Sequence, residues 1–273
     1  MEEPVSFITR FANHVLGHWA LALLSLLHIK PENPALPIPQ PVVMGVIVVA
    51  LLTVLALILR SRLSVERPGA LQQIAEGLIT NSLGFGIRDL LEENAGHDAA
   101  RYVPFVGSIS VFILVANLFG AIPNTFVTPP TGVVTVPLAC ATLTFLYFNW
   151  HGIRHHGALG YVKSFSGPVW WLAPLMIPVE MISTIARVLS LTVRLWANIF
   201  ASDLLYYIFL SLLSGLTLWG WDKTAAGGAL LGIFAATVPI AFLGLHLLVS
   251  FIQAYVFTIL PSVYLGLATA DEH

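Results

Sequence analysis

Five ionisable side chains fall inside the long apolar stretches of the second half of the chain. They are Glu180, Arg187, Arg194, Asp203 and His246. Charges at membrane depth are costly and usually mark an ion pathway. Carboxyl and imidazole groups take up and release protons, whereas a guanidinium stays charged at every relevant pH. These residue types therefore indicate proton transfer beside a permanent positive charge.

The spacing of three of these residues puts them on one helix face. Glu180, Arg187 and Arg194 are seven positions apart, which is nearly two helical turns. Polar residues four positions from members of this row lie on the same face, namely Ser183, Ser190 and Asn198. The pattern predicts a polar stripe about five turns long on an otherwise apolar helix.

A second polar stripe follows on the last apolar stretch. His246, Ser250 and Gln253 recur there at helical spacing. In an antiparallel helix pair, one register would place Arg194 opposite Gln253 and Asp203 opposite His246. Asp203, however, lies nine residues after Arg194, which is about 180° around an ideal helix. Both can face the last helix only if the helix bends, and otherwise they serve different water pockets.

Structural explanations stay open for the individual residues. Glu180 and Arg187 could form an inert ion pair near a membrane interface, and Arg194 could extend to lipid headgroups. His246 could be a core histidine, and Gln253 could be purely structural. Their concentration in one half of the chain favours a shared function over four separate explanations.

The composition indicates an integral membrane protein. The chain is 57% hydrophobic and only 10% charged, whereas soluble domains are about one quarter charged. A water-soluble fold of this size could not bury so much apolar surface. A net charge of -2 argues against a nucleic-acid partner. The sequence has no glycine-rich phosphate loop, and we expect neither a nucleotide site nor a cofactor or metal.

We expect an all-α fold, a single polytopic membrane domain with about five membrane-crossing helices plus interfacial amphipathic helices. Polar loops are predicted at 123–132, 151–167 and 219–228. The two final apolar stretches are each long enough, at 1.5 Å per residue, to exceed the ~30 Å hydrocarbon core about twofold. The expected segments are an external amphipathic segment (1–40), a first span (41–62), an interfacial or cytoplasmic segment (64–100), second and third spans (101–150) and a hairpin of two long tilted helices carrying the ion path (168–267).

Loop charge predicts the orientation. The segment after the first span and the loop at 151–167 hold most of the lysine and arginine, whereas the loop at 123–132 holds none. The positive-inside rule places the first two in the cytoplasm. The N-terminus is then outside and the C-terminus cytoplasmic. No transit sequence precedes the first span, which favours a bacterial plasma (inner) membrane.

Two runs resemble a known family. The run from Ser190 to Ala201, with Arg194, Trp196 and Asn198 in it, resembles the arginine segment of subunit a of F-type ATP synthases of the bacterial type. The run Gln253-Ala254-Tyr255-Val256-Phe257 and its continuation to Leu265 resemble the last helix of the same subunit. The resemblance covers the order of helices along the chain and is sharpest over 178–267.

This resemblance implies a proton-translocating stator subunit with two offset half-channels against a rotating ring. The implied partners are the c-subunit ring, the b-subunit peripheral stalk and the rest of the ATP synthase complex, with catalysis in other subunits. By matching position, Arg194 would face the ring beside Asn198 and Gln253. The remaining positions would divide between an outer half-channel, with Asp203 and His246, and a cytoplasmic path, with Glu180, Arg187 and Ser190.

The sequence differs from the family pattern at two places, and two other functions would also explain buried charges or long apolar helices. The family usually has Phe-Gly where this chain has Trp196-Ala197, and often glutamate where it has Asp203. A free-standing proton-coupled secondary transporter would also bury charges, but such proteins usually show repeated halves around a midplane site. A membrane scaffold without transport would not need five buried ionisable groups.

Overall fold

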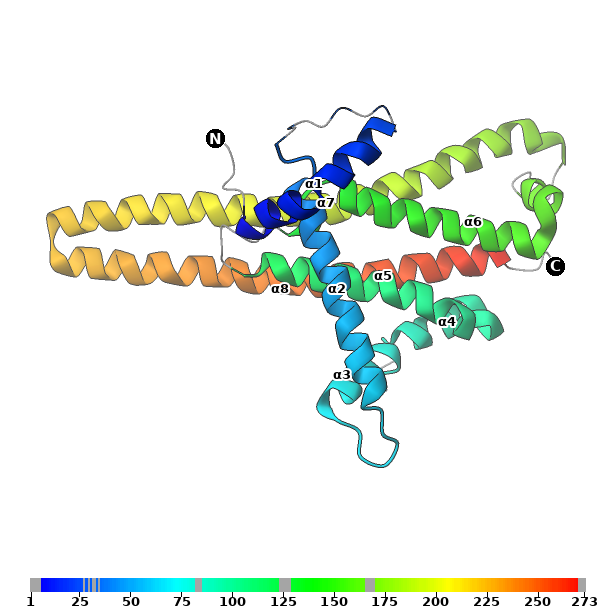
Figure 1. Cartoon of the computed structure of the whole chain (residues 1–273), viewed down its shortest axis with the longest axis horizontal. Coiled ribbons are helices and arrows are strands. Elements are labelled where there is room, and N and C mark those ends of the chain that lie inside the picture. The colour runs from blue at the N-terminus through cyan, green and yellow to red at the C-terminus, as the bar shows by residue number, and fades with distance from the viewer. Residues whose placement is uncertain are drawn as a thin grey trace. The chain divides into compact units, whose positions relative to one another are not determined.

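The structure is a computed structural model that describes residues 6–26, 28, 30, 33, 35–81, 85–122, 129–164 and 170–269. Within these ranges every regular element is a helix (Figure 1). The chain divides into two compact units. Unit 1 comprises Met1–Ile47, Leu114–Val133 and Leu195–Ile252, and unit 2 comprises Val48–Ile113, Val134–Arg194 and Gln253–His273.

The helices follow one another with short connections. In chain order they are α1 (Phe7–Leu26), α2 (Gln40–Ser61), α3 (Ala70–Ile79), α4 (Ile87–Ala95), η1 (Gly96–Asp98), α5 (Ala99–Gly120), η2 (Pro130–Gly132), α6 (Thr135–Ser164), η3 (Trp170–Leu172), α7 (Ala173–Lys223) and α8 (Ala225–Thr269). The segment 64–100, predicted as interfacial or cytoplasmic, holds two short α-helices, α3 and α4. Part of the loop predicted at 123–132 lies outside the described residues.

Four helices of the described chain are long and apolar enough to cross a membrane: α2, α5, α7 and α8. At 1.5 Å per residue, the 22 residues of α2 and of α5 extend about 33 Å, close to the ~30 Å hydrocarbon core. The polytopic all-α prediction is confirmed. Helix α6 is less apolar than α2, and its crossing stays a prediction.

Helices α7 and α8 are each continuous, with 51 and 45 residues, and only Thr224 separates them. The prediction of a loop at 219–228 is therefore wrong, because α7 and α8 both extend into that range. Their lengths correspond to about 75 Å and 68 Å, more than twice the hydrocarbon core. A helix without a reversal can cross a bilayer only once, so each long stretch supplies one crossing and not two.

The end of α7 and the start of α8 form an antiparallel hairpin within unit 1, visible as the yellow and orange helices in Figure 1. The rings of Phe209 and Phe242 stack with their centroids 4.9 Å apart. Further along, a Cβ at Gly232 would lie 3.6 Å from the Thr217 side chain. These contacts define the register that places residue 203 opposite residue 246, as the polar pattern predicted.

Helix α6 extends beyond Trp150, where the sequence predicted a polar loop over 151–167. Its helical backbone is interrupted only at Gly157, which has φ 75°. Glycine adopts this left-handed conformation without a Cβ penalty. Beyond the kink, the Tyr161 hydroxyl donates a hydrogen bond to Asn149 Oδ1 at 3.0 Å. The chain thus turns while it stays helical to Ser164, and residues 165–169 lie outside the description.

Helix α1 in unit 1 is amphipathic with its apolar side outward. Thr9, Asn13 and Gly17 are buried, and the Asn13 amide donates to the Ile38 carbonyl at 3.0 Å. Apolar residues at steps of three or four along the helix are exposed: Ile8, Phe11, Val15, Trp19, Leu23 and Leu26. A helix of this kind is typical of the membrane interface, where the apolar side contacts lipid.

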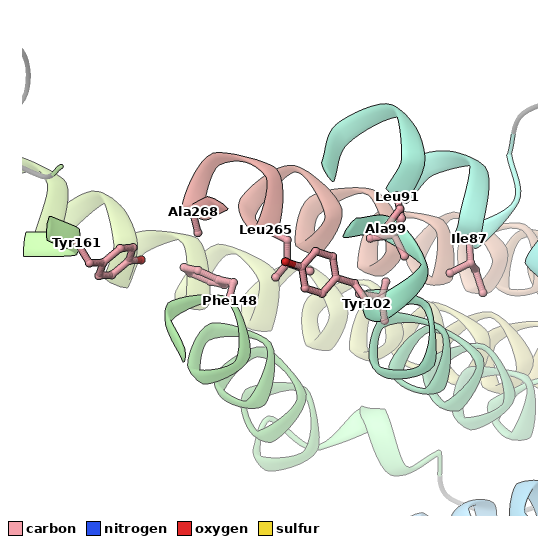
Figure 2. Packing of buried hydrophobic residues seen from close by; sticks show 9 residues of the cluster. Ile87, Leu91, Ala99, Tyr102, Phe148, Tyr161, Leu265 and Ala268 are labelled. Atoms are coloured by element: carbon pink, nitrogen blue, oxygen red, sulfur yellow. The ribbon is translucent and has the colours of Figure 1, made fainter. Parts of the chain in front are cut away.

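Unit 2 has an apolar core in which α8 packs against α4 and α5. The cluster, shown in Figure 2, consists of Ile87, Leu91, Ala99, Tyr102, Val106, Phe148, Tyr161, Leu265 and Ala268. Gly266 permits this packing, because a Cβ there would collide with the backbone of Asn94. Polar contacts add to it: Ser110 Oγ donates to the Phe257 carbonyl at 3.2 Å. Small and hydroxyl residues are the usual means of close packing between membrane helices.

Candidate functional site

His246 is enclosed within unit 1. Its side chain is 4% exposed, and its Nε2 lies 3.0 Å from the backbone oxygen of Asn117 near the end of α5. Its own carbonyl accepts a hydrogen bond from Ser250 Oγ at 2.8 Å. His246 is therefore a buried, hydrogen-bonded core histidine, as one of the explanations above had it. Whether it can also transfer protons depends on which other groups lie close to the ring.

The end of helix α5 makes the Asn117 carbonyl available. The last four carbonyls of an α-helix have no partner within it, and α5 ends at Gly120. The next amide, of Ala121, donates to the Leu118 carbonyl at 3.1 Å. This tighter turn leaves the oxygen of Asn117 for an outside donor, and the His246 imidazole is that donor.

The contact with Asn117 assigns the two ring nitrogens of His246. A carbonyl oxygen only accepts hydrogen bonds, so Nε2 must carry hydrogen in both the neutral and the charged imidazole. In the neutral ring, Nδ1 is then the basic atom. Nδ1 is therefore the ring atom left for contacts with other groups, while Nε2 fixes the orientation of the ring.

Asp203 is the acidic group nearest to this chemistry in the hairpin. It is half-buried on α7 and lies within electrostatic range of His246 on α8. The structure thus brings together the pair that the antiparallel register predicted. A carboxylate beside the imidazole can stabilise its charged form and exchange a proton with it directly or through water.

Two residues of this site were not predicted from the sequence: Asn117 and Thr131. Both are fully buried, and Thr131 Oγ1 donates to Asn117 Oδ1 at 2.7 Å. Asn117 Nδ2 is buried without a hydrogen-bond partner. An asparagine inside an apolar span was the available signal, because an amide in hydrocarbon is costly. Thr131 carried no such signal, since it follows two prolines in a turn.

Glycine at position 120 gives the imidazole its space. A Cβ there would lie 3.0 Å from His246 Nε2 and 3.1 Å from the Cβ of Pro129. Contacts of this length force a neighbour to move, and the ring is held between the α5 terminus and α8. The absence of a side chain at Gly120 is therefore part of how the ring is positioned.

Arg194 has a different environment, in unit 2. The residue is exposed, as is Ser190 one turn earlier. Within the described part of the chain, Arg194 has neither an ion pair nor a hydrogen bond. On other sides of this part of α7, apolar side chains are more than half exposed: Ile182, Ile185, Leu189 and Val193. The guanidinium is thus exposed on a helix that is long and apolar enough to cross a membrane, and it is unpaired among the described residues.

Gln253 does not contact Arg194 as the polar stripes suggested. Its side chain is 2% exposed, and its Oε1 is buried without a partner. The register of the hairpin holds, but helical geometry turns the two residues differently. Because Asp203 faces α8, a residue nine positions earlier faces away from α8 on an ideal helix. Of the two predicted pairs, only Asp203 and His246 face each other.

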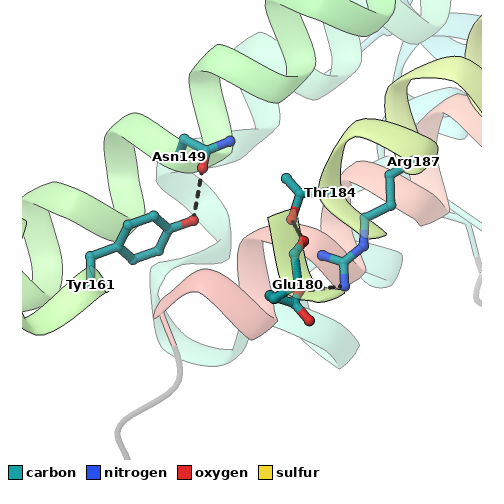
Figure 3. Close-up of polar contacts among 5 residues, drawn as sticks. All are labelled: Asn149, Tyr161, Glu180, Thr184 and Arg187. Carbon is teal, nitrogen blue, oxygen red and sulfur yellow. Dashed lines mark hydrogen bonds and ion pairs between the residues drawn. The ribbon is translucent and has the colours of Figure 1, made fainter. Parts of the chain in front are cut away.

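Glu180 and Arg187 form the ion pair that their spacing allowed. Arg187 Nη2 lies 3.2 Å from Glu180 Oε1, with the two side chains 28% and 35% exposed respectively, as Figure 3 shows. The guanidinium also lies over the ring of Tyr264, 5.1 Å from its centroid, a cation–π contact. Tyr161 is within electrostatic range of both charges. A polar group of residues from α6, α7 and α8 results.

Asn198 is half-buried in unit 1, and its carbonyl accepts a hydrogen bond from Ser202 Oγ at 2.8 Å. Among the described residues, no set of three or more His, Cys, Asp or Glu side chains could hold a metal ion.

Comparison with known proteins identifies the family. The ATP synthase A chain family matches residues 42–266. ATP synthase subunit a of Koribacter versatilis (strain Ellin345) is 39% identical over 98% of both chains, and that of Solibacter usitatus (strain Ellin6076) is 40% identical over 96% of this chain and 100% of its own. The subunit a of Trichlorobacter lovleyi is 34% identical over the full length of both. The chain belongs to the ATP synthase A chain family.

Membership in the ATP synthase A chain family settles the class of function. The chain is a membrane-embedded, proton-translocating subunit of an F-type ATP synthase. The resemblance of the segment around Arg194 is thereby confirmed at the level of the family. The free-standing transporter is not favoured, because the similarity extends over nearly the whole chain.

Proposed function

We propose that Arg194 is the fixed positive charge that faces the rotating c-subunit ring. The observation that carries this proposal is its exposure on a helix that can cross the membrane, without an ion pair among the described residues. An arginine in hydrocarbon costs about 3 kcal/mol by insertion measurements. An acidic group supplied by another subunit at the same depth would offset this cost.

The ring would carry one carboxyl group in mid-membrane on each subunit. Protonated, this group can face lipid; ionised, it needs a cation. Arg194 gives the ionised form a partner, and a guanidinium cannot release its own proton. It therefore keeps protons from passing directly between the two half-channels. Gln253 and Asn198 would be its polar neighbours in the assembled complex, and the b-subunit peripheral stalk would hold the chain still.

The outer half-channel would contain Asp203 and His246. Imidazole and carboxyl groups are the usual proton carriers in such paths. With Nε2 held by the Asn117 carbonyl, the exchange runs through Nδ1, and Asp203 takes or supplies the proton. Each proton that crosses the full potential releases roughly 2.3 kcal/mol per 100 mV, the energy that drives rotation.

The cytoplasmic path would contain Glu180, Arg187 and Ser190. Glu180 is paired with Arg187 and partly exposed, and Ser190 lies one turn from Arg194 on the same exposed side. A proton released near Arg194 would thus meet a hydroxyl and then a carboxylate. This places the path along the first half of α7, whereas Asp203 lies on its second half.

The membrane would be the bacterial inner membrane, with the N-terminus outside and the C-terminus in the cytoplasm. The relatives named above come from bacteria, and the basic residues of the 151–164 segment favour a cytoplasmic location. This orientation puts the ion pair of Glu180 on the cytoplasmic side of the hairpin.

Replacement of Arg194 by alanine tests the central proposal. In inverted membrane vesicles, Arg194→Ala should reduce proton-driven ATP synthesis to background while the chain stays inserted and assembled. Arg62→Ala is the matched control, since Arg62 is an exposed arginine next to the end of α2 and should leave synthesis near the wild-type rate. Coupled synthesis by the Arg194→Ala enzyme at a normal rate would refute the proposal.

A further inference from the structure

A polar cavity of about 180 Å³ lies in unit 2, where the start of α5, the end of α8 and α6 come together. Its walls are Asp98, Arg101, Tyr102, His151, Arg154, His155 and Thr269. The volume is several times the roughly 30 Å³ of one water molecule in the liquid. None of these residues belongs to the proton path proposed above.

The walls of this cavity are suited to an anion. Arg101 and Arg154 bring two positive charges and Asp98 one negative charge, which leaves a net charge of +1 with neutral histidines. Tyr102 and Thr269 add hydroxyl groups that lie within hydrogen-bonding reach of each other. Arginine and hydroxyl donors together are the usual ligands of phosphate, which arginine can bind through two parallel hydrogen bonds.

The cavity is rigid on one side and open on the other. Tyr102 is 2% exposed, and its ring contacts His151 edge-on with the centroids 5.2 Å apart. His151 is fixed in turn, because its Nδ1 lies 2.9 Å from the Tyr147 carbonyl. Arg101 and Arg154 are exposed at the rim. Fixed aromatic walls with exposed cations at the rim suit a ligand that enters from outside.

The position of the cavity along the helices corresponds to headgroup depth. Arg101 lies within the first turn of α5, which begins at Ala99, and Thr269 is the last residue of α8. Both helices are long and apolar enough to cross the membrane. Nearby Trp150 is 64% exposed, as is common for aromatic residues at the membrane interface. Basic pockets between membrane helices on the cytoplasmic side bind phosphate-bearing headgroups.

We infer that this cavity is a phosphate-binding site, filled by the headgroup of a membrane phospholipid. Arg101 and Arg154 bind the phosphate oxygens from the rim, and the Tyr102 hydroxyl donates to the same group from the wall. The Thr269 hydroxyl, which donates to the Leu265 carbonyl at 2.8 Å, lines the wall beside it. Asp98 accepts a hydrogen bond from a headgroup hydroxyl or ammonium group. Free orthophosphate shares the recognised chemistry and is distinguished from lipid in the experiment.

The experiment uses the assembled ATP synthase in neutral detergent. Native mass spectrometry counts dioleoyl phosphatidylglycerol molecules retained by the wild type, by an Arg101→Gln/Arg154→Gln variant and by Arg154→Gln alone. Loss of both charge-assisted bonds should weaken retention at this site by at least about tenfold. Dioleoylglycerol, which lacks the phosphate, should not be retained there. ATP hydrolysis by each preparation reports whether the complex is intact.

Arg88→Gln is the matched control. Arg88 belongs to the same unit but lies outside the cavity, paired with Glu92, so this variant should retain phosphatidylglycerol like the wild type. Binding of inorganic phosphate, detected by ³¹P NMR, together with equal lipid retention in all variants would assign the cavity to free phosphate. That result would overturn the lipid assignment. Equal lipid retention in all four proteins, together with no phosphate binding by ³¹P NMR, would overturn the inference. The milder Arg154→Gln variant keeps this test valid if the double variant does not assemble.

Discussion

His246 and Arg194 lie on the same two-helix hairpin, but in opposite environments. In unit 1, His246 is buried, bonded to the Asn117 carbonyl and close to Asp203. In unit 2, Arg194 is exposed and has no ion pair among the described residues. The histidine site has its partners within the chain, whereas the arginine would, under the proposed function, find its partner in another subunit.

Under the proposed function, this difference would follow from what each group has to do. A group that passes protons to and from water has to keep one orientation, and fixed hydrogen bonds supply it. A group that pairs in turn with many moving carboxylates must not be paired already. If an acid of its own chain held Arg194, the ring carboxylates would have to compete with that acid at every step.

Removal of the carboxylate at Asp203 should give the largest effect on proton flux through the histidine site. Asp203→Asn cannot take up or release a proton, so we expect proton flux from the outer side to fall at least about tenfold, as measured by dye quenching in vesicles. Asp222→Asn changes an exposed acid near the end of the same helix and serves as control. If the flux through Asp203→Asn matches the wild type across a broad pH range, Asp203 is not in the path.

Addition of a methyl group next to the imidazole should give the second largest effect. In Gly120→Ala the new Cβ lies 3.0 Å from His246 Nε2, so the ring or the end of α5 has to move. We expect proton flux to decrease about fivefold with assembly preserved, since misplacement by about 1 Å can cost a reaction even more. Gly244→Ala, where the added Cβ meets nothing within 4 Å, should leave the flux unchanged. Equal behaviour of the two variants would contradict the positioning of His246 by this contact.

Loss of the Thr131 hydroxyl should have a smaller effect. Thr131→Val keeps the shape but removes the donor to Asn117 Oδ1, so a buried acceptor loses its partner. Hydrogen bonds between membrane helices contribute about 0.6 kcal/mol on average, up to about 1.7. We expect a loss of about 1 kcal/mol in unfolding experiments in detergent and a twofold to threefold decrease in flux. Thr131→Ser retains the hydroxyl and should keep most of the stability and most of the proton flux. If the serine variant is as impaired as the valine variant, the hydrogen bond is not the cause.

Neutralisation of Glu180 should have the smallest effect on stability. Both partners of the ion pair are about one-third exposed, and exposed pairs contribute about 0.2–1 kcal/mol. Glu180→Gln should therefore destabilise the chain by less than about 1 kcal/mol, as should Glu92→Gln at the surface pair with Arg88. If Glu180 belongs to the cytoplasmic path, only Glu180→Gln also slows proton release, which flux measurements in oppositely oriented vesicles can separate. Equal flux in both variants would leave Glu180 with the purely structural role.

The sequence was most informative where composition and period decide the outcome. The apolar run that became α2 was predicted almost to the residue, because a span in hydrocarbon needs uninterrupted apolar side chains. The ion pair of Glu180 with Arg187 followed from their spacing on one helix face. The boundaries at 151–167 and 219–228 were wrong, because polar residues and glycines do not stop a helix when the bilayer interface can solvate them.

By itself, the sequence determined that this chain lives in a bilayer, which long helices it forms, and that an arginine, an aspartate and a histidine lie deep within them. Only the tertiary structure decided that Asp203 faces His246 while Arg194 is exposed, and that Asn117 and Thr131 complete the histidine site. The reason is physical. Helical period fixes which residues share a face, but the direction of that face and the partner of a free carbonyl at a helix end depend on segments more than a hundred residues away.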